Sequence, residues 1–168
     1  KSYSGEGIII SNETAKGVIL KGVNKNEKKI IEFFDKFSSK YNIKDFKSNN
    51  IYIGSELAFD LGLKKGDTLN LMSSAFVMTP LGSLPKQENF KVAGIFNTGF
   101  LDFDQNIAFV NIEDALSIFE KEKDDQNIEI YLEDPLRANI YKDKIQKINQ
   151  NYFIYTWSDL NKSLFSAL

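Results

Sequence analysis

Residues 68–96 read TLNLMSSAFVMTPLGSLPKQENFKVAGIF, and this stretch governs the interpretation of the whole chain. Residues 68–76 alternate loosely between apolar and polar side chains, and residues 90–96 form a second apolar run, so both are predicted to be β-strands. Residues 78–89 between them hold two of the three prolines, together with glycine, serine and asparagine. These residue types favour turns, so the sequence predicts a long hairpin with an oversized, turn-rich tip.

Three apolar side chains, Met78, Leu81 and Leu84, stand inside this turn-rich segment. If the tip is exposed, proline lowers the conformational entropy lost on binding, and clustered apolar side chains mark an interaction surface. The alternative is a hairpin end that folds back and buries its leucines. The residues alone favour neither reading.

A helix is predicted over residues 26–37, with Asn24 or Asn26 as its N-cap. Its apolar residues recur at i, i+3, i+4 and i+7: Ile30, Phe33, Phe34 and Phe37. Three short apolar runs on the N-terminal side of the hairpin are predicted to be strands: residues 8–10, 18–23 and 51–53.

Two further helices have readable ends. Residues 55–61 are expected to be helical, with Ser55 as N-cap and Gly62 in the left-handed conformation that ends a helix. Asn111 is predicted to cap a helix over residues 112–120.

The C-terminal part alternates between strand and helix patterns. The predicted strands are residues 107–110, 127–132 and 152–155. Pro135 suits the first turn of a helix, which Leu136, Ile140, Ile145 and Ile148 continue, and Trp157 starts a helix that leaves the domain.

The elements together predict one α+β domain, residues 1–168, with a mixed sheet. Its sublobes are a strand-rich part with the hairpin (residues 50–100) and an α+β part (residues 1–49 and 101–157). Residues 158–168 are expected to begin the exit helix.

Composition excludes several classes of site. The 168 residues contain no Cys and no His, which excludes disulfides, Cys/His zinc sites, thiol catalysis and Ser-His-Asp triads. The net charge is −2 and Arg137 is the single arginine, so nucleic acid is not an expected partner. The chain begins at Lys1 and ends in an apolar run, so we expect an excised segment of a longer protein.

Asp102 and Asp104 are the candidates for metal binding or acid/base catalysis. In an extended segment their carboxylates would share a face, although no further ligands stand out. The favoured reading is a loop in which Phe100 and Phe103 pack inward and the acids face water.

Several segments in order resemble the lipoprotein-releasing ABC permeases of the LolC/LolE type, within the MacB-like superfamily. Residues 79–85 (TPLGSLP), followed by residues 90–96, resemble the hairpin of that family. Residues 99–104 (GFLDFD) are similar to its Gly-Met-x-Glu-Tyr-Asp segment. Residues 17–23 resemble the early strand of the family, and residues 56–67 resemble its small helix with a Gly-Asp turn. Trp157 with Asn161, Leu164 and Phe165 resembles its lead into the second membrane helix.

The resemblance implies a MacB-like periplasmic domain between the first two membrane helices of an inner-membrane permease. Such permeases work with a cytoplasmic ATPase and a second permease copy or paralogue, and pass outer-membrane lipoproteins to a periplasmic carrier of the LolA type. The chain itself would then be no enzyme and would hold no cofactor or metal.

The resemblance also implies a carrier-binding hook and a second polar contact beside it. The hook would consist of Met78, Thr79, Pro80, Leu81, Gly82, Ser83, Leu84 and Pro85, and the second contact of Lys86, Gln87 and Lys91. Glu88 departs from the basic or neutral residue expected there.

Two questions stay open. One is whether the parent permease is one of two paralogues or a single form serving as both. The other is whether the domain belongs instead to a MacB-like efflux or mechanotransmission permease that contacts an adaptor protein, which a buried hairpin would favour.

Overall fold

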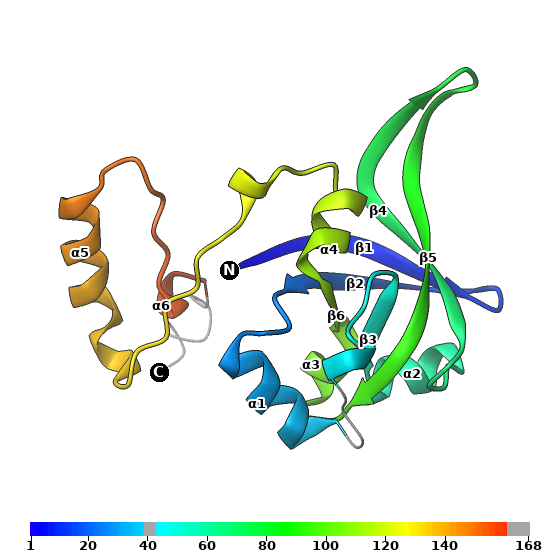
Figure 1. The fold of residues 1–168 in the computed structure, drawn as a ribbon, viewed down its shortest axis with the longest axis horizontal. Coiled ribbons are helices and arrows are strands. Elements are labelled where there is room, and N and C mark those ends of the chain that lie inside the picture. Colours follow the sequence, from blue (N-terminus) through cyan, green and yellow to red (C-terminus); the bar gives the residue numbers. More distant parts are fainter. Residues whose placement is uncertain (39–42, 161–168) are drawn as a thin grey trace. The chain divides into compact units, whose positions relative to one another are not determined.

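The computed structural model describes residues 1–38 and 43–160, and the chain divides into two compact units, residues 1–128 and 129–168. The first unit contains a closed barrel in the order β1-β2-β6-β3-β5-β4 (Figure 1). Its strands are β1 (Ser2–Ser11), β2 (Thr14–Val23), β3 (Asn50–Gly54), β4 (Thr68–Thr79), β5 (Gly82–Phe96) and β6 (Ile107–Asn111). The pairs β2–β6 and β3–β5 are parallel and the others antiparallel, so the predicted α+β fold with a mixed sheet is confirmed.

The barrel interior follows from the two-residue period of the strands. Ile51 and Ile53 of β3 point into the interior cluster, whereas Tyr52 between them points to the outside, where it is nonetheless buried. β6 repeats the pattern with Ala108 and Val110 inside and Phe109 outside. These strands are therefore covered on both faces, which is why they read as unbroken apolar runs.

Aromatic side chains cover that outer face. Helix α1 (Lys28–Phe37) places the ring of Phe33 5.3 Å from that of Phe109 and 5.6 Å from that of Phe96. Phe34 lies 4.7 Å from Tyr52, between ring centroids. The predicted apolar face of this helix is confirmed, and burying the Phe34 ring, which is fully covered, contributes about 1.5–3 kcal/mol.

The helix positions are confirmed but their predicted side-chain caps are wrong. Glu27 precedes α1, and Asn24 instead accepts a hydrogen bond from the backbone N–H of Asn26, 3.0 Å away. Ser55 is the first residue of α2 (Ser55–Leu61), not its cap. Asn111 precedes α4 (Ile112–Ile118) without a capping hydrogen bond from its side chain. Gly62 does adopt the left-handed conformation, with φ of 64°.

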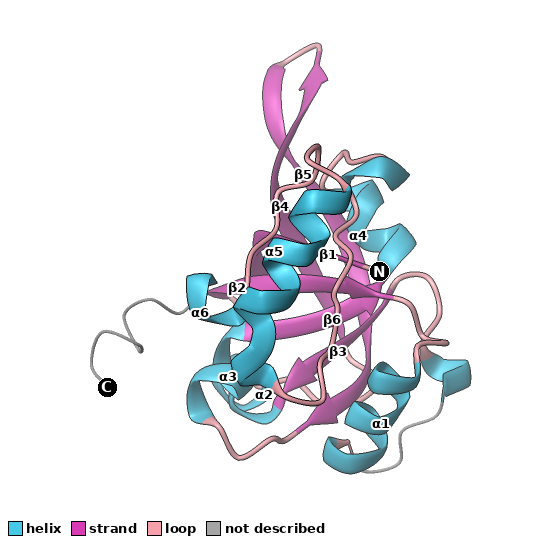
Figure 2. Ribbon diagram, turned by 90° about the vertical axis from the view of Figure 1, so that its left-hand side faces the viewer, coloured by secondary structure: helices cyan, strands magenta, loops and turns pink. Residues whose placement is uncertain are grey.

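The hairpin is longer and more regular than predicted. β4 and β5 stay paired to Thr79 and Gly82, leaving a two-residue turn, so the expected oversized tip is wrong. Proline is tolerated at position 85 because β5 pairs here only with β4 within the described residues. No strand on the other edge of β5 therefore needs an N–H from Pro85. Figures 1 and 2 show the hairpin extending beyond the barrel, with α1, α2 and α3 (Leu101–Asn106) at the opposite end.

Three short 3-10 helices and two α-helices complete the described elements: η1 (Ile43–Asp45), η2 (Lys123–Asp125), η3 (Pro135–Arg137), α5 (Ala138–Ile148) and α6 (Trp157–Leu160). In the second unit, the Asp159 carboxylate accepts from Lys142 Nζ at 2.7 Å and from the Thr156 backbone N–H at 2.9 Å. Hydrogen bonding to Lys142, and then to Thr156, lowers the pKa of Asp159 to about 2. This pair fastens α5 to the start of α6.

The predicted strands over residues 127–132 and 152–155 are wrong. Apart from one bridge between Asn127 and Ser2, neither segment forms a ladder within the described residues. Ile130 is 60% exposed and Phe153 90% exposed. A strand pattern needs a partner strand as well as the right side chains. The predicted exit helix beyond Leu160 lies outside the described residues.

Gly54 is required where β3 meets α3. A Cβ at this position would lie 2.0 Å from the backbone oxygen of Asp104, so Gly54→Ala forces backbone apart. We expect it to lower the free energy of unfolding by about 1–3 kcal/mol in urea denaturation. Gly17→Ala is the matched control, because nothing lies within 4 Å of its Cβ, and it should be neutral or slightly stabilising. Equal losses in both variants would contradict the close approach.

Candidate functional site

The tip of the hairpin is built by local hydrogen bonds. The Thr79 hydroxyl donates to the carbonyl of Gly82 at 2.8 Å and accepts from the backbone N–H of Leu81 at 3.2 Å. Gly82 has φ of 116°, a conformation that side-chain-bearing residues rarely adopt, so it supplies the tight turn. Pro80 and Leu81 form the turn itself and are fully outside the strands.

Large apolar side chains are exposed along this hairpin. Leu81 is 92% exposed and Met78 84%, and Leu84 is 48% exposed. Phe76, at 62%, is a fourth member that the sequence reading missed, although it stands two residues before Met78 and therefore on the same face. Register places Val77 opposite Leu84 on the other face, so both faces of the ribbon are apolar.

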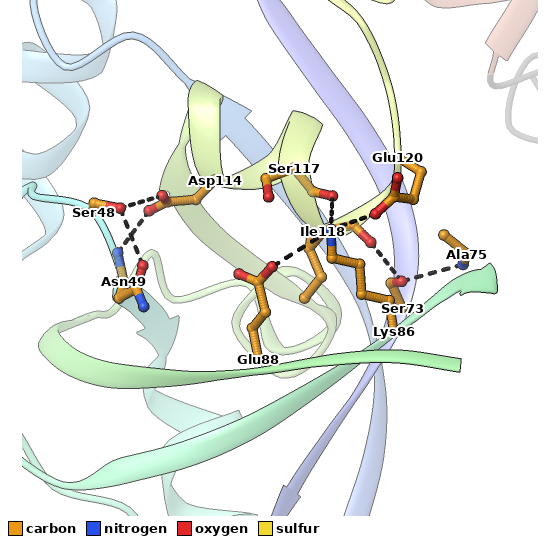
Figure 3. Close-up of polar contacts among 10 residues, drawn as sticks. All are labelled: Ser48, Asn49, Ser73, Ala75, Lys86, Glu88, Asp114, Ser117, Ile118 and Glu120. Atoms are coloured by element: carbon orange, nitrogen blue, oxygen red, sulfur yellow. Dashed lines mark hydrogen bonds and ion pairs between the residues drawn. The ribbon is translucent and has the colours of Figure 1, made fainter. Parts of the chain in front are cut away.

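Lys86 lies at the base of the hairpin and is engaged within the domain (Figure 3). Its ammonium donates to the carbonyl of Ser117 at 2.8 Å, pairs with the Glu120 carboxylate, and lies 3.8 Å from Glu88. On the neighbouring strand, the Ser73 hydroxyl donates to the carbonyl of Ile118 at 2.7 Å. Lys86 was expected to offer a polar contact to a partner, but in the structure it joins the hairpin to α4.

The other two residues of the expected second contact are accessible. Gln87 and Lys91 are exposed and two-residue spacing along β5 puts them, with Asn89 between, on one outward face. Lys91 lies opposite Thr68, where β4 begins, so this polar stripe runs along the base of the hairpin and away from the tip.

The start of α4 is also fixed to the barrel. The buried carboxylate of Asp114 accepts from the Ser48 hydroxyl at 2.6 Å and from the Asn49 backbone N–H at 2.8 Å (Figure 3). Asn49 has φ of 60°, and the bond to Asp114 helps to hold this left-handed residue in place before β3. The start of α4 is therefore attached to the turn before β3, and its end to β4 and β5.

Asp102 and Asp104 do not form a site together. Residues 101–106 are helical, not an extended loop, so side chains two positions apart point in different directions. Asp102 is exposed, and Asp104 is buried and accepts from the Thr98 hydroxyl at 2.7 Å and the Thr98 backbone N–H at 3.0 Å. The expectation that both acids face water is wrong for Asp104, as is the inward packing of Phe100, which is 74% exposed.

Other site types find no support in the part of the chain that the structure describes. Over residues 1–38 and 43–160, no three acidic side chains gather in a way that could hold a metal ion. Over the same residues, the helices are too short or too polar to cross a membrane. The exposed hairpin is thus the candidate functional site.

Comparison with known proteins gives a consistent family. No family model matches the chain. It is 31% identical over 120 residues to the lipoprotein-releasing system transmembrane protein LolC of Xylella fastidiosa, covering 71% of this chain and 29% of that protein. It is 25% identical over 169 residues to the Neisseria meningitidis protein of the same name, covering 98% of this chain and 41% of that protein. It is 30% identical over 178 residues to the Buchnera aphidicola protein of that name, covering 95% of this chain and 42% of that protein. The chain thus spans less than half the length of these relatives.

The two aspartates allow a direct test of the structural role of Asp104. Asp104→Asn replaces one carboxylate oxygen by an NH₂ donor beside the backbone N–H groups of Thr98 and Gly99 and the Thr98 hydroxyl. We therefore expect a loss of about 1–3 kcal/mol in the free energy of unfolding. Asp102→Asn, on the same helix and exposed, should change stability by less than about 0.5 kcal/mol. If both substitutions left urea denaturation unchanged, Asp104 would not hold the turn at residues 98–99.

Proposed function

This chain belongs to the LolC-type family of lipoprotein-releasing permeases, and from that premise we propose that it is the periplasmic domain that recruits a lipoprotein carrier through its hairpin. The observation that carries the proposal is the exposure of Phe76, Met78, Leu81 and Leu84 on a two-stranded ribbon. Apolar clusters of this kind mark interaction surfaces. A folded-back, buried hairpin would have favoured the MacB-like alternative, and no observation on the hairpin supports that reading.

The proposed mechanism keeps acyl chains out of water. Each methylene that leaves an apolar environment for water costs about 0.8 kcal/mol, so a lipoprotein cannot cross free solvent at a useful rate. A hairpin that holds the carrier at the permease lets the lipid pass directly between two apolar sites. The tip residues Pro80, Leu81, Leu84 and Pro85 supply the contact, with Met78 beside them and Gly82 shaping the turn.

The remaining parts of the system lie outside this chain. We assign ATP hydrolysis to a separate cytoplasmic subunit, lipid handling to membrane helices of the permease and of its second copy or paralogue, and the domain to the periplasmic face of the inner membrane. Gln87 and Lys91 are proposed as the second, polar contact with the carrier, which Asn89 extends on the same face of β5.

Carrier binding by the full-length permease tests this proposal. Leu81→Asp and Leu84→Asp each place a charge in the proposed contact and should weaken binding by about 1–2 kcal/mol, a factor of about five to thirty. Affinity is measured by titrating the cognate LolA-type carrier onto detergent-solubilised permease.

Phe59→Asp is the matched control for this titration. Phe59 is 83% exposed and lies on α2, at the end of the barrel opposite the hairpin, so its replacement should leave affinity unchanged. Undiminished binding by both tip variants would refute recruitment through the hairpin.

A further inference from the structure

We propose that Lys86 is a positioning residue, which locks the base of the hairpin to the end of α4 and thereby presets the direction of the tip. The use of that direction for carrier capture rests on the function proposed above. The lock itself is argued only from contacts within residues 1–128.

The hairpin needs a lock because of how it leaves the barrel. Pairing between β1 and β4 ends at Gly7 and Ser73, and beyond this point β4 is paired with β5 alone. The β4–β5 register also shifts between Met72 and Phe76, which places a bulge at the exit. Bulges bend and twist strands, and a two-stranded ribbon twists more freely than a wide sheet. The exit is therefore the point at which the hairpin could swing.

Each strand of the hairpin donates one hydrogen bond to α4 beside this point. The Ser73 hydroxyl of β4 donates to the Ile118 carbonyl at 2.7 Å, and Lys86 of β5 donates to the adjacent Ser117 carbonyl at 2.8 Å (Figure 3). Carbonyls in the last turn of a helix have no partner within the helix, and the helix dipole favours a cation there. Two contacts from two strands resist both tilting and twisting.

The charges around Lys86 hold its side chain in this position. Glu120 pairs with the ammonium directly, and Glu88 lies 3.8 Å away on the same strand as Lys86. The Lys86 side chain is only 22% exposed, and little of it is accessible to a partner. The far end of α4 is tied through Asp114 to Ser48 and Asn49, so the hairpin is locked to a helix that is itself fixed.

This arrangement explains what Lys86 adds to binding. A tip that already points in one direction loses less conformational entropy when a partner binds, so affinity depends on the lock without contact between Lys86 and the partner. If Lys86 touched the partner directly, reversing the ion pair would restore the direction of the hairpin without restoring affinity. That difference makes the proposal testable.

The experiment is a charge-reversal cycle in the full-length permease, comparing wild type, Lys86→Glu, Glu120→Lys and the double variant. Two readouts are used: the distance distribution between spin labels at Ser83→Cys and Glu113→Cys without carrier, and carrier affinity in the unlabelled proteins. The chain has no native cysteine, so within it only the two introduced residues take the label, and any cysteine elsewhere in the permease is first replaced by serine. Lys91→Glu, on the same strand but outside the lock, is the control for the distances alone, because Lys91 is itself proposed to contact the carrier. Phe59→Asp is the control for affinity.

Lys86→Glu should broaden the distance distribution and weaken carrier binding about fivefold. The double variant should restore both in part, because it remakes the ion pair while a carboxylate at position 86 cannot donate to the Ser117 carbonyl. Lys91→Glu should leave the distances unchanged. An unchanged distribution in Lys86→Glu would overturn the lock. Restored distances without restored affinity would also overturn it, because Lys86 would then contact the carrier itself. Distances that respond as expected, in a permease whose wild type does not bind the carrier, would support the lock and refute the proposed function.

Discussion

The last turn of α4 is the element on which the hairpin depends. Its carbonyls at Ser117 and Ile118 accept hydrogen bonds from Lys86 and Ser73, one on each strand of the hairpin. A two-stranded ribbon carrying apolar side chains on both faces is marginal in water by itself. Fixed at its base to a helix that Asp114 ties to the barrel, the same ribbon can stay extended with Met78 and Leu81 in solvent.

The barrel provides the rigidity behind this contact. Its central strands are covered inside by mainly aliphatic side chains and outside by the rings of α1, so β3, β5 and β6 have little freedom to shift. β5 runs from this buried region directly into the hairpin, from Phe96 back to Gly82. The near-neutral chain, with net charge −2, offers little long-range attraction to a partner, which agrees with the proposal that binding relies on the exposed apolar tip.

Residue patterns predicted the fold well where the signal is local. The spacing of Ile30, Phe33, Phe34 and Phe37 identified α1, and Gly62 identified the end of α2. Residue patterns failed where secondary structure depends on residues distant in the sequence. Residues 82–89 contain glycine, serine, proline and asparagine, which favour turns, but they form strand because β4 lies beside them. Residues 152–155 have the strand pattern and no ladder partner in the described chain.

The site was predictable in part for the same reason. Apolar residues between prolines located the tip, and alternation could have added Phe76. The inward role of Lys86 could not be read from the sequence, since its partner Glu120 is 34 positions away, and nothing local indicates that Asp104 is buried while Asp102 is exposed.

The central claim is that the tip touches the carrier, and site-specific crosslinking in the living cell tests it most directly. A photo-reactive phenylalanine analogue would replace Leu81 in one permease and Phe59, at the opposite end of the barrel, in another. The account predicts a carrier adduct from position 81 and none from position 59. Adducts absent at position 81, in a permease that still releases lipoproteins, would contradict it.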